Sequence, residues 1–488
     1  MGADAGGAHR RGRVALLVAV CACLLTAVPV GSQQVPVNAQ PAAGVTGAEP
    51  AQGTAAQQLG AGAQLRTGTT SGMDVEARLR SLLADHQFFL LEGQLDKLPS
   101  AEAQLYRGIL ANRNNDPKAS IQLLEPLVDQ VAAGGDKAQE KTVRKALAED
   151  YLRAGDWAKA AKAYQVLDSR VKAQLSPDEL DEIEMPLKML PLAAANPPMT
   201  VDPCDPFSLQ VSRNPLGLTD IPVFVDARPH TWMLDPTAPF NLIARSLAKE
   251  AGLKVSEEFT TIHGLTGRPI AVHVAVVPRF TIGGLLTLRN MTVFVFEDAD
   301  YAFKKSKYQV EGVLGYPALS ALGSLTVTAD STIEVRPAVQ VQHPDKDDRA
   351  SGGARFFLDG DQVIVALGRT GEERMFAVDA GGQQTYLTSR YFDEHSAEFA
   401  GQKMELFSIP GSQSLPPQPA YVAETIALPV GTAEVTVHFV QVLTAPVGSA
   451  ALDDVYGVLG VDALEQVKSY TFDYRTMRFS IVAQTGRE

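Results

Sequence analysis

Apolar residues recur at helical spacing from residue 73 to about residue 190. A period near 3.6 places them on one face of each helix, as expected for helices that bury one side. Polar turns at 112–116 and 155–156 interrupt the pattern. The positions that carry it include Leu79, Leu82, Leu83, Phe88, Leu91, Leu105, Leu110, Ile121, Leu124, Leu147, Tyr151, Trp157 and Tyr164. The pattern predicts a helical domain over residues 73–190.

From Phe207 onwards the apolar pattern takes the two-residue period of strands. Short β-type runs alternate with turns rich in Gly, Asn, Asp and Pro. These runs lie at 221–225, 272–277, 286–288, 291–296, 356–357, 363–365, 424–428, 435–442 and 470–482. A short helix is predicted at Arg245–Ala251, where Gly252 would end it. The downstream half is therefore predicted to be a β domain.

Two segments of unusual composition divide the chain further. Residues 191–206 are rich in proline, which lacks a backbone donor, so we expect a domain boundary there. Residues 342–353 are charged and contain glycine, as in a linker. The β domain then divides into one lobe over residues 200–341 and a second over residues 354–484.

The first 32 residues have the pattern of a secretion signal. A basic segment from His9 to Arg13 precedes the apolar run 14–30, and Val30-Gly31-Ser32 fits a cleavage site. The run is short for a spanning helix, which needs roughly 20 residues. We expect a secreted or periplasmic protein with no membrane span after signal cleavage; an uncleaved signal would instead tether it to the membrane. Residues 33–72, rich in Ala, Gly and Gln, predict a disordered tether.

Charge and cysteine content exclude several classes of function. The formal net charge is −13, and nucleic-acid binding needs clustered Lys and Arg, so we expect no nucleic-acid partner. Two of the three cysteines, Cys21 and Cys23, lie in the signal, which leaves Cys204 without an intramolecular disulfide partner. No Cys or His cluster has metal-ligand spacing, so neither a metal nor another cofactor is expected.

One apolar stretch that ends in an aspartate occurs twice. The first copy spans 233–243 and contains Asp235, and the second spans 376–387 and contains Asp379. Each has a downstream Gly-Val-Leu-Gly motif: Gly315 follows Asp235 by 80 residues, and Gly460 follows Asp379 by 81.

The similarity between the two halves continues beyond the glycine motifs. Residues 319–327 align with residues 464–472 without a gap. Duplication of one β-rich lobe is the simplest explanation. Two lobes that each bring one aspartate to a turn predict an acid pair at the middle of the domain.

This arrangement resembles the retropepsin-like and pepsin-like aspartic proteases. The resemblance rests on the two Asp turns, the two Val-Leu-Gly motifs and their matched spacing, over about 207–482. It implies a multidomain α + all-β protein in which a helical repeat domain precedes a bilobal β aspartic-protease-like domain. It also implies that Asp235 and Asp379 hydrolyse a peptide or protein substrate. One acid would activate a water and the other would protonate the scissile carbonyl, with no cofactor.

Both turns depart from the Asp-Thr-Gly motif of that family. The first reads Asp-Pro-Thr-Ala, so Pro236 supplies neither a donor nor a hydroxyl. The second reads Asp-Ala-Gly-Gly, which keeps Gly381 but has Ala380 in place of the hydroxyl residue. Thr237 could restore a bond from the adjacent position. These changes leave two functions open: an active endopeptidase, or an inactive pseudoprotease that binds peptides or acts as a scaffold.

Two loops occupy the positions at which loops of this family cover the substrate-binding cleft. Residues 262–267, with His263 and Gly264, occupy the place of the flap hairpin in the first lobe, and 408–421 the equivalent place in the second. A substrate-covering role would make Thr237, Gly381, His263 and Gly264 substrate-binding residues. An ordinary hairpin turn is the alternative.

The helical domain resembles tetratricopeptide-type helix pairs. Gly108 and Ala148 are small residues at which two helices can approach closely, each near an aromatic residue, although their separation of 40 exceeds the period of about 34 in that family. Such a domain either docks a protein partner or stacks on the next domain as a spacer.

Overall fold

The computed structural model describes residues 72–263, 269–337, 352–360, 362–369, 371–382, 384–409, 416–448 and 450–484. The predicted signal peptide, nearly all of the predicted tether and most of the predicted linker lie outside these ranges. All described residues belong to one compact unit, Thr69–Glu488. No helix in the described ranges is long and apolar enough to cross a membrane.

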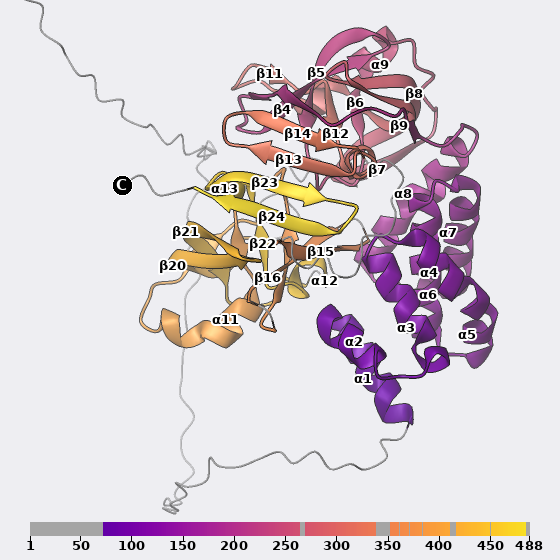
Figure 1. Cartoon of the computed structure of the whole chain (residues 1–488), viewed down its shortest axis with the longest axis vertical. Helices are drawn as coiled ribbons and strands as arrows, with labels where there is room; N and C mark the ends of the chain where they lie inside the picture. Colours follow the sequence, from indigo (N-terminus) through magenta and orange to yellow (C-terminus); the bar gives the residue numbers. More distant parts are fainter. Residues whose placement is uncertain are drawn as a thin grey trace, which may run out of the picture. The chain divides into compact units, whose positions relative to one another are not determined.

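The N-terminal part of the described chain is helical, as the periodicity predicted (Figure 1). Its α-helices are α1 Gly72–Ala84, α2 Phe88–Leu95, α3 Ser100–Arg113, α4 Pro117–Leu124, α5 Val128–Gly134, α6 Lys137–Arg153, α7 Trp157–Val171 and α8 Pro177–Ala193. Gly108 of α3 lies against Leu124 of α4, where an added Cβ would approach the leucine side chain to 2.4 Å. This close approach is the one the sequence predicted; kinship with tetratricopeptide repeats stays a prediction.

Helix α8 extends beyond the predicted boundary. It continues to Ala193 with Pro186 and Pro191 inside it, whereas the sequence predicted an end near residue 190. Ser176 begins the helix with a capping box to Glu179. Met189 of α8 is fully buried and joins the core of the first lobe. This packing holds the last turn together although proline removes hydrogen bonds there.

The first lobe consists mainly of strands and includes the short helix α9 Arg245–Glu250, which the sequence predicted. The main strands are β2 Phe207–Gln210, β3 Ser212–Arg213, β4 Thr219–Val225, β5 Arg228–Leu234, β6 Leu242–Ala244, β7 Phe259–His263, β8 Pro269–Ile282, β9 Leu286–Phe296, β12 Gly312–Leu314, β13 Ser324–Thr328 and β14 Thr332–Arg336. The lobe is completed by strand β1 Thr200–Val201, by a two-stranded sheet of β10 Ala302–Phe303 and β11 Tyr308–Gln309, and by helix α10 Tyr316–Ser320. The two runs predicted at 286–288 and 291–296 form one strand, in which Asn290 has a φ of 54° and no ladder partner.

The second lobe repeats this order of elements. Its strands are β15 Ala354–Asp359, β16 Gln362–Leu367, β17 Arg374–Val378, β18 Tyr386–Leu387, β19 Glu405–Phe407, β20 Gln418–Val430, β21 Ala433–Leu443, β22 Gly457–Leu459, β23 Val467–Asp473 and β24 Arg478–Ala483, with helices α11 Ser389–His395, α12 Ala450–Asp453 and α13 Val461–Leu464. The single run predicted at 470–482 is a hairpin of β23 and β24. Its turn forms because the Asp473 carboxylate accepts the amide of Arg475 (3.0 Å).

Equivalent strands of the two lobes pair in the same way. In the first lobe β12 runs parallel to β5 and antiparallel to β6; in the second, β22 runs parallel to β17 and antiparallel to β18. The lobes join where β13 pairs antiparallel with β23 (Figure 1). Thr326 and Thr471, which the sequence alignment makes equivalent, lie directly opposite each other there, with their hydroxyls 2.8 Å apart. The two halves are thus related by an approximate twofold axis through this pair.

Helices α1 to α3 pack on the second lobe through a shared apolar core. Phe88 and Leu91 of α2 are buried with Phe357 of β15 and Ala377 of β17, and the Phe88 and Phe357 rings are 4.7 Å apart. Alternate residues of β17, such as Phe376, face the main core of the β domain. The strand that carries Asp379 is therefore buried on both faces.

A polar cluster borders this contact. Asp359 lies 2.6 Å from Nε2 of His86 and 2.7 Å from the guanidinium of Arg113. Burial raises the pKa of Asp359, but the charges of Arg113 and His86 outweigh it, so the net pKa is well below the usual range. The helices and the second lobe are held together by both apolar packing and a partly buried ion pair.

Candidate active site

Asp235 follows β5 and lies at the end of the apolar run that the sequence singled out. Its amide donates to the Leu314 carbonyl (3.1 Å) of the neighbouring glycine motif. Its Oδ1 accepts three hydrogen bonds, from the amide of Thr237 (3.0 Å), the hydroxyl of Thr237 (2.9 Å) and the amide of Ala238 (3.1 Å). One carboxylate oxygen is thus fixed by the turn that follows it.

Asp379 occupies the equivalent place after β17. Its amide donates to the Leu459 carbonyl (3.0 Å), and its Oδ1 accepts the amide of Gly381 (3.1 Å). Asp379 is partly exposed, whereas Asp235 is only 6% exposed. The two acids therefore make equivalent backbone hydrogen bonds but differ in their exposure to solvent.

The two Asp turns touch each other across the lobes. The Ala380 amide donates to the hydroxyl oxygen of Thr237 at 3.0 Å. Because this hydroxyl also donates to Asp235, Thr237 links the second turn directly to the first acid. The sequence left open whether Thr237 replaces the missing hydroxyl contact, and the geometry shows that it makes one such contact.

The electrostatics of the pair follow from this proximity. Burial and, second to it, the charge of Asp379 raise the pKa of Asp235, the three hydrogen bonds to Oδ1 oppose the rise, and the net pKa is about 6. Burial also raises the pKa of Asp379, against the hydrogen bonds from Gly382 and Gly381. Because the charge of Asp379 acts on Asp235, the two acids titrate as a pair, and the more buried Asp235 retains the shared proton longer.

The last glycine of each motif donates a hydrogen bond to a residue that follows the Asp turn. The Gly315 amide donates to Oδ1 of Asn241 (3.0 Å), and the Gly460 amide to the hydroxyl oxygen of Thr385 (2.9 Å). A Cβ on Gly315 would come within 2.1 Å of the Phe240 carbonyl oxygen. Only glycine allows this contact, and a Cβ on Gly460 would likewise come within 2.6 Å of the Gln384 backbone, so each lobe requires glycine at this position.

Comparison with known proteins identifies the first lobe. Residues 221–318 match a family model described as "Aspartyl protease", a range that includes Asp235 and the Gly312–Gly315 motif. The chain contains an aspartic protease-like domain. No curated protein matches the sequence.

Several solved structures resemble the chain at low identity. Basic 7S globulin from soybean has 10% identity over 57% of this chain and 95% of its own, with a TM-score of 0.36. Conglutin gamma, a basic 7S globulin from lupine seeds, has 11% identity over 58% of this chain and 96% of its own, with a TM-score of 0.34. A retropepsin-like aspartic protease from Rickettsia conorii has 14% identity over 28% of this chain and 94% of its own, with a TM-score of 0.20.

The predicted flap residues of the protease-like domain are only partly described. His263 is the last residue of β7 and pairs with Pro269 across the hairpin. Gly264 and the following residues to 268 lie outside the described ranges, as do residues 410–415 of the equivalent loop in the second lobe. A substrate-binding role for His263 and Gly264 stays a prediction.

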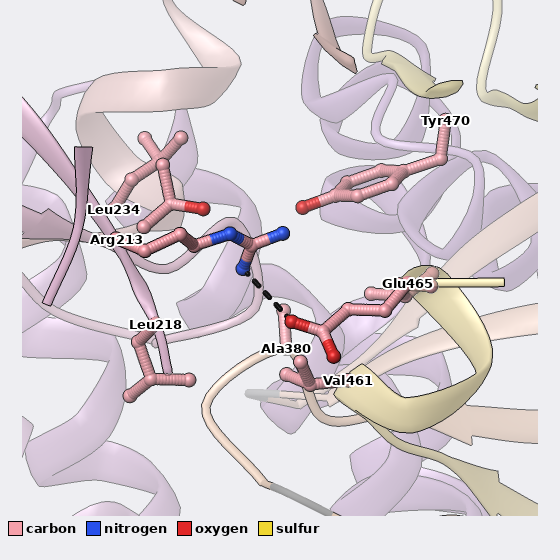
Figure 2. A pocket seen from close by; sticks show the side chains of 9 residues that line it. Arg213, Leu218, Leu234, Ala380, Val461, Glu465 and Tyr470 are labelled. Carbon is pink, nitrogen blue, oxygen red and sulfur yellow. Dashed lines mark ion pairs between the residues drawn. The ribbon is translucent and has the colours of Figure 1, made fainter. Parts of the chain in front are cut away.

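A small cavity of about 10 Å³ lies between the lobes next to the Asp turns, about the space that one water occupies. Leu234 and Ala380, each adjacent to an aspartate, line it together with Tyr470 (Figure 2). Arg213 and Glu465 form an ion pair across it at 3.3 Å. This contact ties the two lobes beside the acid pair.

Sequence reasoning missed two residues at the site. Gly382 approaches the second acid so closely that a Cβ there would lie 2.3 Å from Oδ2 of Asp379. The double glycine at 381–382 was the available signal for it. Tyr474 contacts the first turn from the second lobe, and no local pattern marks that residue. No cluster of His, Cys, Asp or Glu suited to a metal occurs among the described residues.

Proposed function

We propose that this protein is an exported aspartic endopeptidase that hydrolyses peptide bonds with a water activated between Asp235 and Asp379. The observation that carries the proposal is the hydrogen bond from the Ala380 amide to the Thr237 hydroxyl. It joins the two Asp turns while the same hydroxyl holds Asp235. Turns joined in this way keep two acids facing one water, which is the arrangement the chemistry requires.

The proton positions support a division of roles. Asp235, with a pKa of about 6, keeps its proton at mildly acidic pH and can donate it to the scissile carbonyl. Asp379 is the more exposed acid and, when ionised, can take a proton from the attacking water. These transfers give a tetrahedral diol, with Asp379 protonated and Asp235 ionised. Asp379 then protonates the leaving amine and Asp235 accepts a proton from a diol hydroxyl as the C–N bond breaks, which restores both acids to their starting state.

Substitution of each acid tests this function. Asp235→Asn and Asp379→Asn each keep the shape of the side chain but remove one titrating group. Activity on a casein or peptide library between about pH 3 and pH 8 should fall to background in both variants. Asp393→Asn, which changes an exposed acid on α11, is the matched control and should retain wild-type activity. Equal activity of wild type and both active-site variants would refute the proposal.

A non-catalytic binding protein is the second candidate. It is favoured by the absence of a hydroxyl at both Pro236 and Ala380, and by the low exposure of Asp235. In that case purified wild type would cleave no member of the library at any pH but would still bind some peptides.

Export is supported by the basic and apolar segments at 9–13 and 14–30. Mass spectrometry of the mature protein tests it, since cleavage after the predicted site would leave an N-terminus near residue 33.

A further inference from the structure

The turn after Asp235 is held by the second lobe at two successive residues. The Tyr474 hydroxyl donates to the Pro236 carbonyl at 3.2 Å, and the Ala380 amide donates to the Thr237 hydroxyl oxygen at 3.0 Å. Tyr474 is separated from Pro236 by 238 residues and lies in the turn between β23 and β24. The first turn is therefore fixed by contacts from two distant parts of the second lobe.

Tyr474 is itself rigidly placed. It is 5% exposed, its amide donates to the Gly323 carbonyl of the first lobe (2.8 Å), and its ring meets Tyr316 edge-on at 5.6 Å. Burial raises the pKa of its hydroxyl well above 10, so this group stays protonated and acts as a donor. A donor held in this way defines the position of the carbonyl that it contacts.

The Pro236 carbonyl needs such a donor. Pro236 is buried, and a buried carbonyl without a partner costs free energy. Neither Pro236 nor Ala380 has a side-chain hydroxyl, so the two turns cannot bond through side chains at those positions. Tyr474 supplies a contact between the lobes from outside the repeated motif.

We propose that Tyr474 is a positioning residue, which fixes the Asp235 carboxylate by holding the Pro236 peptide from the opposite lobe. Its effect on catalysis rests on the proposed function; its effect on the turn does not. Without the hydroxyl, the Pro236–Thr237 peptide would lose the hydrogen bond to its carbonyl. The amides and the hydroxyl that fix Oδ1 of Asp235 would then be less well aligned.

The test compares Tyr474→Phe with Tyr391→Phe in the full chain. Both variants remove one hydroxyl from a buried tyrosine of the second lobe. Tyr391 lies on α11, where its ring stacks on that of His395. Hydrogen exchange of the segment 233–240 reports on the turn without any need for activity. The kcat and KM for a peptide that wild type cleaves report on the catalytic function of Asp235.

Tyr474→Phe should speed amide exchange in that segment and lower kcat about tenfold with KM unchanged, because a displaced catalytic group affects the chemical step more than binding. Tyr391→Phe should change neither quantity. Unchanged exchange in Tyr474→Phe, or equal acceleration in both variants, would overturn the positioning role. Faster exchange with an unchanged kcat would overturn its catalytic consequence. If wild type cleaves nothing, the proposed function fails, while the exchange comparison still decides whether Tyr474 positions the turn.

Discussion

Gly382 lies against the Asp379 carboxylate with no room for a side chain. A Cβ at this position would be 2.3 Å from Oδ2 and 2.6 Å from the carboxyl carbon, well inside contact distance. The clash can be relieved only by movement of the acid or of the turn. The conformation of Asp379 therefore depends on a glycine one residue beyond the family's own Asp-X-Gly pattern.

Gly382→Ala should for this reason lower kcat about a hundredfold, the loss expected when a catalytic group moves by about 1 Å. The measurement is steady-state kinetics on any peptide that wild type cleaves. Gly93→Ala, at a position of α2 with nothing within 4 Å of the added Cβ, is the matched control and should keep full activity. Wild-type kinetics for Gly382→Ala would show that Oδ2 of Asp379 need not occupy its present position.

At the scale of elements, the helices form part of the β domain's packing. Helices α1 to α3 cover one face of the second-lobe sheet, and α8 contributes Met189 to the first-lobe core. Of the two roles that the sequence left open for the helical domain, this packing matches the spacer that stacks on its neighbour. A protein partner on the other faces of the helices stays a prediction.

Phe88→Ala should destabilise the protein by about 3 to 5 kcal/mol, because it empties a fully buried aromatic site between α2 and β15. Leu90→Ala changes the same helix at a residue that is 58% exposed, and should alter the free energy of unfolding by no more than about 0.5 kcal/mol. Denaturant unfolding of both variants measures the difference. Equal free energies for the two variants would mean that α2 is not held on the second lobe.

Much of the element order was predictable because it depends on local patterns. The two-residue period gave most strands, and the ungapped alignment of 319–327 with 464–472 identified Thr326 and Thr471 as equivalent before the structure placed them opposite each other. The contact between Thr237 and Ala380 was not predictable, because it depends on how two turns separated by 143 residues meet. The role of Tyr474 depends on the same long-range geometry.

For the whole molecule, buried titrating groups predict greatest stability at mildly acidic pH. The folded-state pKa of Asp235 is raised from 3.8 to about 6, so its contribution to stability declines as pH rises through that interval. Burial lowers the pKa of His86, but Asp359 outweighs it and raises the net value above 6.5, so that contribution is lost at still higher pH. The lowered pKa of Asp359 gives stability that is lost as pH falls below 3.8. The net charge of −13 adds repulsion at neutral pH.

The free energy of unfolding should therefore be larger at pH 5 than at pH 8. Asp235→Asn should reduce this difference by about 1.4 kcal/mol, because about one unit of the shift in pKa from 3.8 to about 6 lies above pH 5. Denaturant unfolding of wild type and variant at the two pH values provides the measurement. Greater stability of wild type at pH 8, or an unchanged difference in the variant, would contradict this account of the buried acid.

The hydrogen bond from the Ala380 amide to the Thr237 hydroxyl joins a main-chain group to a side chain. This difference determines which substitutions each Asp turn tolerates. The second turn contributes a main-chain amide, which every residue except proline would supply at position 380. The first turn contributes a side-chain hydroxyl, which at position 237 only serine or threonine would supply in the same place. Neutral substitutions can therefore accumulate at position 380 of the second turn far more freely than at position 237 of the first. Among natural variants, small residues should interchange at 380, while Ser and Thr alone should alternate at 237.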